Sequence, residues 1–138
     1  MHLRGIAVRL ALGCAIALLA QGCESPMSPG PLAAGTWGGD HAGLTVTNSG
    51  AHLEFDCASG DITQPLIIDG AGRFAVAGLF VQEHPGPVSQ GPDPKAALYS
   101  GQIMRATMTL TVTLVESSTA VGSFVLIRNT EPQVHKCT

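Results

Sequence analysis

The chain has 138 residues, a formal net charge of −3, and few charged (12%) or aromatic (4%) residues. This length suits one domain, and the lack of a basic excess argues against a nucleic-acid partner. Seventeen glycines and nine prolines favour short strands joined by many turns over a helical bundle.

The first 22 residues have the layout of a secretory signal peptide. Arg4 and Arg9 make the start positive, and an uncharged apolar run from Leu10 to Ala20 follows. A membrane-spanning helix needs about 20 apolar residues, so this run is too short to span a bilayer. We therefore expect residues 1–22 to be removed during secretion.

Residues 19–22, which read Leu-Ala-Gln-Gly before Cys23, resemble a bacterial lipobox. The resemblance implies cleavage after Gly22 and a diacylglyceryl group on the Cys23 sulfur, usually followed by acylation of the new amine. An ordinary signal peptide that ends near a cysteine is the alternative. Glu24 follows the cysteine, and in enteric bacteria only aspartate there strongly favours the inner membrane. The resemblance therefore implies a lipid-anchored protein of the cell envelope, at the outer rather than the inner membrane.

Residues 23–34 contain three prolines and show no apolar period. We interpret them as the lipidated cysteine and an extended tether, which at about 3.1 Å per residue would hold the domain roughly 30 Å from the bilayer. The chain then divides into a signal peptide (1–22), a tether (23–34) and a folded domain (35–138).

The cysteines that remain after processing predict one disulfide. Cys14 lies in the signal peptide and Cys23 in the lipobox, so only Cys57 and Cys137 are left. In an oxidising compartment such a pair is expected to be bonded. A metal-binding or catalytic cysteine is the alternative, but the chain has no Cys-x-x-Cys.

Alternating apolar and polar residues predict antiparallel strands through the domain. In the clearest strand, 107–115, four apolar residues face in and the threonines between them face out. Pro65 suggests a strand that begins late or lies at an edge, and Gly78 suggests a bulge or a bend. The expected strands are 44–47, 51–57, 62–68, 73–81, 96–103, 107–115, 121–128 and a short final strand at 133–137.

Seven or eight short strands in about 100 residues predict an all-β fold, a small antiparallel up-and-down barrel, with a sandwich as the alternative. A barrel is favoured because its closure removes the exposed strand edges. The segment Glu83–Lys95 contains four prolines and two glycines and is expected to be a long irregular loop. Loops of this length in small domains are usually functional or disordered.

Gly35-x-Trp37, at the start of the domain, resembles the opening motif of lipocalins. In that family the tryptophan closes the base of the barrel against an arginine of the last main strand, which implies this role for Trp37 and Arg128. The domain is much shorter than a lipocalin and has no following helix. The layout also resembles small lipoproteins of no established activity that begin Gly-Thr-Trp-Gly-Gly-x-His, carry Phe-Asp-Cys and end with a cysteine.

Two histidines are candidate binding residues. His41 follows Asp40 and His84 follows Glu83, and each pair lies beside a glycine-rich or proline-rich turn. If both pairs reached one mouth of the barrel, they and a carboxylate could bind zinc or copper. Solvated surface histidines are the plainer interpretation, so we expect no resident metal or cofactor.

Tyr99 is the remaining candidate contact residue. We expect it to pack inside the barrel, with a ligand or partner contact as the alternative. The chain has no Gly-x-Ser-x-Gly, His-Glu-x-x-His or phosphate loop, so no enzyme is expected. The sequence predicts a non-catalytic binding module for a small apolar ligand. The alternatives are a protein-binding or inhibitor module acting through the 83–95 loop and a periplasmic metal-binding protein.

Overall fold

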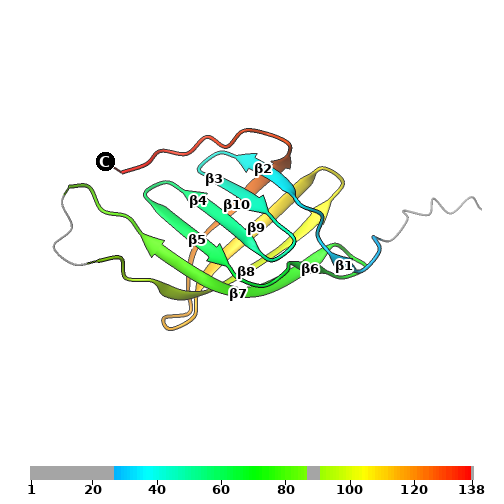
Figure 1. Ribbon diagram of the computed structural model, residues 1–138, viewed down its shortest axis with the longest axis horizontal. Coiled ribbons are helices and arrows are strands. Elements are labelled where there is room, and N and C mark those ends of the chain that lie inside the picture. The colour runs from blue at the N-terminus through cyan, green and yellow to red at the C-terminus, as the bar shows by residue number, and fades with distance from the viewer. Residues whose placement is uncertain (1–26, 87–90, 138) are drawn as a thin grey trace, which may run out of the picture.

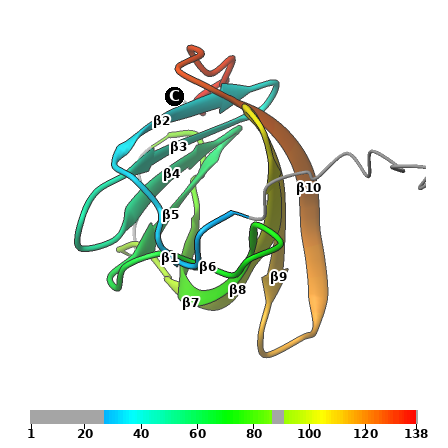
Figure 2. The same cartoon turned by 90° about the vertical axis from the view of Figure 1, so that its right-hand side faces the viewer.

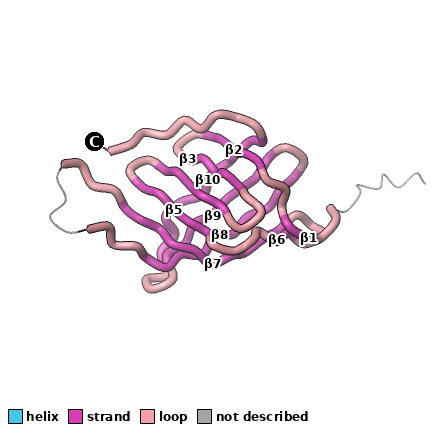
Figure 3. Tube along the Cα trace, viewed as in Figure 1, coloured by secondary structure: helices cyan, strands magenta, loops and turns pink. Residues whose placement is uncertain are grey.

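The computed structural model describes residues 27–86 and 91–137, so the signal peptide and Cys23 lie outside the described chain. Strands and loops make up this part, as Figure 3 shows. Within these ranges no helix is long and apolar enough to cross a membrane. The strands are β1 (Gly30–Pro31), β2 (Gly35–Gly39), β3 (Ala42–Val46), β4 (Ala51–Phe55), β5 (Ala58–Ile62), β6 (Ile67–Ile68), β7 (Arg73–Gln82), β8 (Lys95–Met104), β9 (Thr107–Leu114) and β10 (Thr119–Arg128).

Eight of these strands close into one antiparallel barrel, in the order β10-β2-β3-β4-β5-β7-β8-β9 (Figure 1). Each strand pairs with the next barrel strand along the chain, and β10 returns to pair with β2. Every barrel strand therefore has two neighbours, although β10 meets β2 over only two residue pairs, Ile127 with Gly38 and Arg128 with Trp37. The prediction of a small all-β up-and-down barrel is confirmed, and the sandwich is excluded.

The alternation in β9 shows how the sequence produces an inside and an outside. Met108, Leu110 and Val112 are at most 1% exposed, while the threonines between them point outward. Successive side chains of a strand point to opposite faces, so this pattern buries one face and leaves the other to solvent. Threonine suits the outer face because its β-branched side chain favours a strand.

The predicted strand at 62–68 is only partly right, because it begins after Pro65, as expected, but is two residues long and lies outside the barrel. The chain turns at Asp56-Cys57, where Cys57 has a φ of 51°, and β5 runs back along β4 from Ala58 to Ile62. The alternation of apolar and polar residues does not predict β5, because two of its three inward positions hold only alanine and glycine. After Pro65 the chain forms the two-residue β6, which pairs with β1 outside the barrel.

Part of the expected tether is packed on the barrel. The Leu32 side chain is 5% exposed, and its backbone N–H donates to the carbonyl oxygen of Leu66 at 2.7 Å. Met27 also packs against the hydrophobic core. Only residues 24–26 therefore separate Cys23 from the first described residue.

Two further expectations about strands need correction. The pairing of β7 with β8 is continuous, so Gly78 is not a bulge; the irregularity lies in β10, between Ala120 and Gly122. The final strand at 133–137 is reduced to one parallel bridge, between Asp40 and Gln133. The tail has little room to form a strand because it crosses the outside of a barrel whose strands are already paired.

Candidate functional site

The two ends of the barrel differ (Figure 1). The tryptophan end carries Trp37 and the turns 47–50, 69–72 and 105–106. The disulfide end carries Cys57, Cys137 and the connections 40–41, 56–57, 83–94 and 115–118. The described chain begins beside β1 and β6 at the tryptophan end, while the end of the C-terminal tail and the described parts of the 83–94 connection, residues 83–86 and 91–94, lie at the other end, as Figure 1 shows.

Trp37 and Arg128 lie together at the tryptophan end. They are direct partners in the pairing of β2 with β10, and the Arg128 guanidinium carbon lies 4.8 Å from the centre of the Trp37 ring. Trp37 is 1% exposed, whereas Arg128 is exposed. A cation placed over an indole face is attracted by its π electrons. The structure thus brings together the two residues that the lipocalin resemblance pairs.

Tyr99 fills the middle of the barrel. It is fully buried, and its hydroxyl donates to the Leu79 carbonyl oxygen at 2.6 Å. Burial raises the pKa of Tyr99 well above its ordinary value of 10.0, so the hydroxyl stays protonated. A Cβ on Gly60 would overlap the tyrosine oxygen, and a Cβ on Gly78 would lie 2.8 Å from the ring. The interior next to Tyr99 therefore has no room for even one added methyl group.

Three phenylalanines fill the part of the interior nearer the disulfide end. The Phe55 ring lies 5.8 Å from that of Phe80 and 5.2 Å from that of Phe124, measured between ring centres, in tilted arrangements. Aromatic pairs favour such offset contacts. Phe55 and Phe80 are at most 5% exposed. Together with the buried Trp37 and Tyr99, these rings are part of one hydrophobic core inside the barrel.

The C-terminal tail, residues 129–137, joins the two ends along the outside of the barrel. It crosses Gly38 and Gly43, where a Cβ would collide with the tail. The backbone N–H of Cys57 donates to the His135 carbonyl oxygen at 3.0 Å. The tail ends in the Cys57–Cys137 disulfide, with a Cα–Cα distance of 4.8 Å. The expected disulfide is therefore present.

A band of paired charges lies on the outer face of β4 and β5. The two His52 ring nitrogens lie 2.7 Å from Asp61 and 2.6 Å from Glu54, and Lys136 binds both Glu54 and Glu83. The hydrogen bond with Asp61 raises the pKa of His52 above 6.5, against the effect of burial, and Glu54 adds to the rise. Desolvation raises the pKa of Glu54, but the hydrogen bonds from Lys136 and His52 outweigh it, so the net shift is downward.

Both histidines of the metal hypothesis lie in connections at the disulfide end. The Nδ1 atom of His41 lies 2.5 Å from a carboxylate oxygen of Asp56. The His84 side chain is exposed. The hydrogen bond from the His135 backbone N–H lowers the pKa of Asp56, and the hydrogen bond with His41 adds a smaller decrease. Among residues 27–86 and 91–137, no group of three or more His, Cys, Asp or Glu side chains could hold a metal ion. Glu83 is instead engaged by Lys136 at 3.1 Å.

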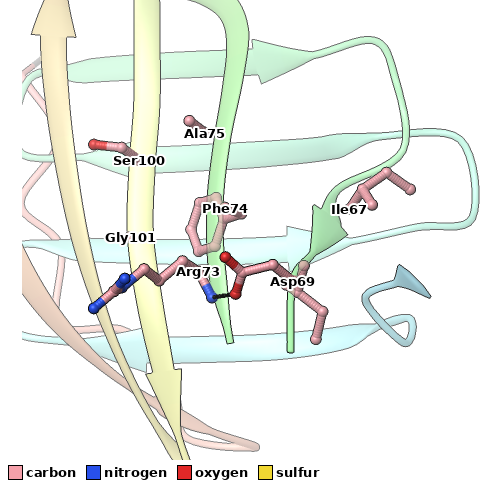
Figure 4. A pocket seen from close by; sticks show the side chains of 8 residues that line it. Ile67, Asp69, Arg73, Phe74, Ala75, Ser100 and Gly101 are labelled. Carbon is pink, nitrogen blue, oxygen red and sulfur yellow. Dashed lines mark hydrogen bonds between the residues drawn. The ribbon is translucent and has the colours of Figure 1, made fainter. Parts of the chain in front are cut away.

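A shallow groove of about 500 Å³ lies outside the barrel, where β6 meets β7 and β8 (Figure 4). The Asp69 carboxylate at its rim accepts hydrogen bonds from the backbone N–H groups of Arg73 and Ala71, both at 2.9 Å. The bond from Arg73, more than that from Ala71, lowers the pKa of Asp69. The Arg73 side chain points away from that carboxylate, as Figure 4 shows. The groove is lined by Ile67, Ile68, Asp69, Arg73, Phe74, Ala75, Ser100 and Gly101.

Sequence reasoning did not find this groove because its lining comes from three separate strands. The turn residues 69–72 indicate that β6 is followed by a return strand, β7, but nothing in the order of residues places β8 beside this turn. Comparisons with protein-family models, curated proteins and solved structures find no match for this chain.

Proposed function

We propose that the protein is a bacterial envelope lipoprotein, anchored through a lipid on Cys23, whose barrel is a non-catalytic module that binds a protein partner through its disulfide end. The anchor is supported by the lipobox-like residues 19–22 and the apolar run before them. The Cys57–Cys137 disulfide suits an oxidising compartment outside the cytoplasm. Glu24 after the cysteine favours the outer membrane.

The observation that carries the binding role is the long 83–94 connection at the end opposite the first described residue. It is the longest connection between barrel strands. Its start is held rigidly, because the Glu83 backbone N–H donates to the Cys57 carbonyl oxygen at 2.8 Å and the Glu83 carboxylate binds Lys136. Loops carried on a rigid scaffold are common binding elements.

The filled interior argues against a small apolar ligand inside the barrel. Ligand pockets usually measure about 300–1,000 Å³ and bury most of the ligand. Tyr99 and the three phenylalanines already occupy the interior. The groove where β6 meets β7 and β8 is open to solvent, so it would cover only one side of a small ligand. The protein-partner role is therefore the better supported of the two.

Deleting residues 88–94 tests the binding role. In the full chain produced in its own envelope, we expect the deletion to leave the urea midpoint unchanged and to abolish co-purification of a protein partner. A matched control replaces Ser117 and Ser118, in a turn at the same end, with glycine and should keep the partner. Undiminished recovery after the deletion contradicts the role of the loop.

The anchor is tested separately. We expect labelled palmitate to enter the protein, and a Cys23→Ser variant to take up none. Equal labelling of both proteins contradicts the anchor. Native mass spectrometry of the protein from its own envelope then distinguishes a bound protein from a bound small molecule.

A further inference from the structure

We propose that the tryptophan end rests on the bilayer, with Arg73, Arg105 and Arg128 against the phosphate groups of anionic phospholipids. The proposal rests on the lipid anchor at Cys23 and adds to it a surface and an orientation for the domain. The 83–94 loop would then face away from the membrane.

The position of Met27 limits how far this end can lie from the bilayer. A Cβ on Gly70 would lie 3.7 Å from the Met27 carbonyl oxygen, and one on Gly72 would lie 2.8 Å from the Met27 sulfur. The chain therefore meets the barrel at the turn between β6 and β7. Four residue steps lead back from Met27 to Cys23, and even a fully extended chain covers only about 14 Å in four steps. This is less than half of the roughly 30 Å that an extended tether would allow.

The arginines of the domain are concentrated at the same end. Arg73 begins β7, Arg105 lies in the turn between β8 and β9, and Arg128 ends β10. All three are exposed. In the described part of the chain, the ion pairs involve histidine and lysine, and no carboxylate lies within 4.0 Å of these three guanidinium groups. Guanidinium groups suit phosphate because they can donate two parallel hydrogen bonds.

The carboxylates are distributed in the opposite sense. Toward the tryptophan end, Asp69 is occupied by backbone N–H groups, Asp61 is paired with His52, and Glu131 lies exposed in the tail. Most of the others lie at or beside the disulfide end, namely Asp40, Glu54, Asp56, Glu83, Asp93 and Glu116. An anionic surface would therefore attract one end of the barrel and repel the other.

Exposed apolar side chains accompany the arginines. Met104 is 67% exposed, next to Arg105, and Ile67 is 55% exposed at the groove that Arg73 also lines. Figure 2 looks onto this end and shows β1 and β6 in front of the barrel strands. Apolar side chains flanked by basic ones are typical of surfaces that lie at the boundary between headgroups and acyl chains.

The test uses the lipidated protein in vesicles of phosphatidylcholine alone or with about 30% phosphatidylglycerol. An environment-sensitive fluorophore is attached to a Met104→Cys or a Ser117→Cys variant, and quenching by acrylamide in water is measured. We expect the label at position 104 to be protected several-fold in the anionic vesicles and less in the neutral ones. The label at 117, at the far end, should stay fully accessible in both.

A charge reversal supplies the second arm. An Arg73→Glu/Arg105→Glu variant should lose the protection at position 104 while its urea midpoint stays unchanged. A Glu116→Arg variant is the matched control and should keep the protection. Equal quenching at 104 and 117, or equal protection in both lipids, overturns the proposal. Failure of the protein to float with either vesicle would instead show that the anchor itself is absent.

Discussion

The two ends of the barrel are closed by different interactions. At the tryptophan end, a buried indole and an exposed guanidinium stack on one another, and short turns complete the surface. At the disulfide end, a covalent bond, backbone hydrogen bonds and ion pairs join the tail to β4, β5 and the start of the long connection. The difference has a physical reason. A long connection and a tail add backbone groups that no barrel strand can pair, so they need partners of their own.

Removing the disulfide should produce the largest effect at either end. We expect a Cys57→Ser/Cys137→Ser variant to lose roughly 4 kcal/mol of unfolding free energy, because the bond no longer restricts the unfolded chain. Urea unfolding of the oxidised protein and the double variant measures the loss. Reduction of the native protein by a thiol should reproduce it. A loss below about 1 kcal/mol would mean that the tail's hydrogen bonds alone hold this end.

The interior between the two ends can be probed through Gly60 and Tyr99. Gly60→Ala should cost about 1–3 kcal/mol, because the added methyl group overlaps the Tyr99 hydroxyl. The same substitution should cost less in a Tyr99→Phe background, where that oxygen is gone. The double-mutant cycle measures this coupling. Additive effects would show space beside Tyr99 and would revive the hypothesis of a ligand inside the barrel.

Arg128→Ala tests how much the stacked pair contributes to the tryptophan end. We expect a loss of about 0.5–1 kcal/mol in unfolding free energy, since the Arg128 side chain is exposed and its contact with Trp37 is partly screened. Arg105→Ala, at the same end but with no aromatic ring beneath it, is the control and should change stability little. Equal losses in the two variants would contradict a specific role for the Trp37 contact.

The smallest expected effect is a pH dependence at His52. Its pKa in the folded protein is raised above 6.5, so its pairing with Asp61 and Glu54 is fully present below that pH. This contribution is lost as the pH rises through the folded-state pKa. The stability gap between the native protein and His52→Gln should therefore be wider at about pH 5.5 than at about pH 8.5, by less than about 1 kcal/mol for this half-exposed group. Urea midpoints at the two pH values measure it, and a gap that widens toward alkaline pH would contradict the assignment.

The strands were predictable where large apolar residues alternate with polar ones. The alternation at 107–115 located β9 because each inward position holds a large side chain. It failed in β5, where Ala58 and Gly60 supply little hydrophobic signal. That strand depends instead on its pairing with β4 and on the turn at Cys57.

The candidate site was predictable residue by residue but not as an arrangement. His41 and Glu83 stand out in the sequence, whereas their partners Asp56 and Lys136 lie 15 and 53 residues away. Such pairs depend on how the strands are ordered around the barrel. The sequence pattern carries no information about that order beyond the preference for neighbouring strands to pair.

By itself, the sequence determined the all-β class, the inward faces of the longer strands and the one cysteine pair available for a disulfide. These follow from the local alternation of apolar and polar residues and from the presence of only two cysteines, Cys57 and Cys137, in the domain. Only the tertiary structure decided that three phenylalanine rings pack together inside the barrel, that the tail crosses its outside, and that three arginines gather at the end where the described chain begins. Each of these depends on closure of the sheet, which brings distant residues together and leaves a fixed volume for their side chains.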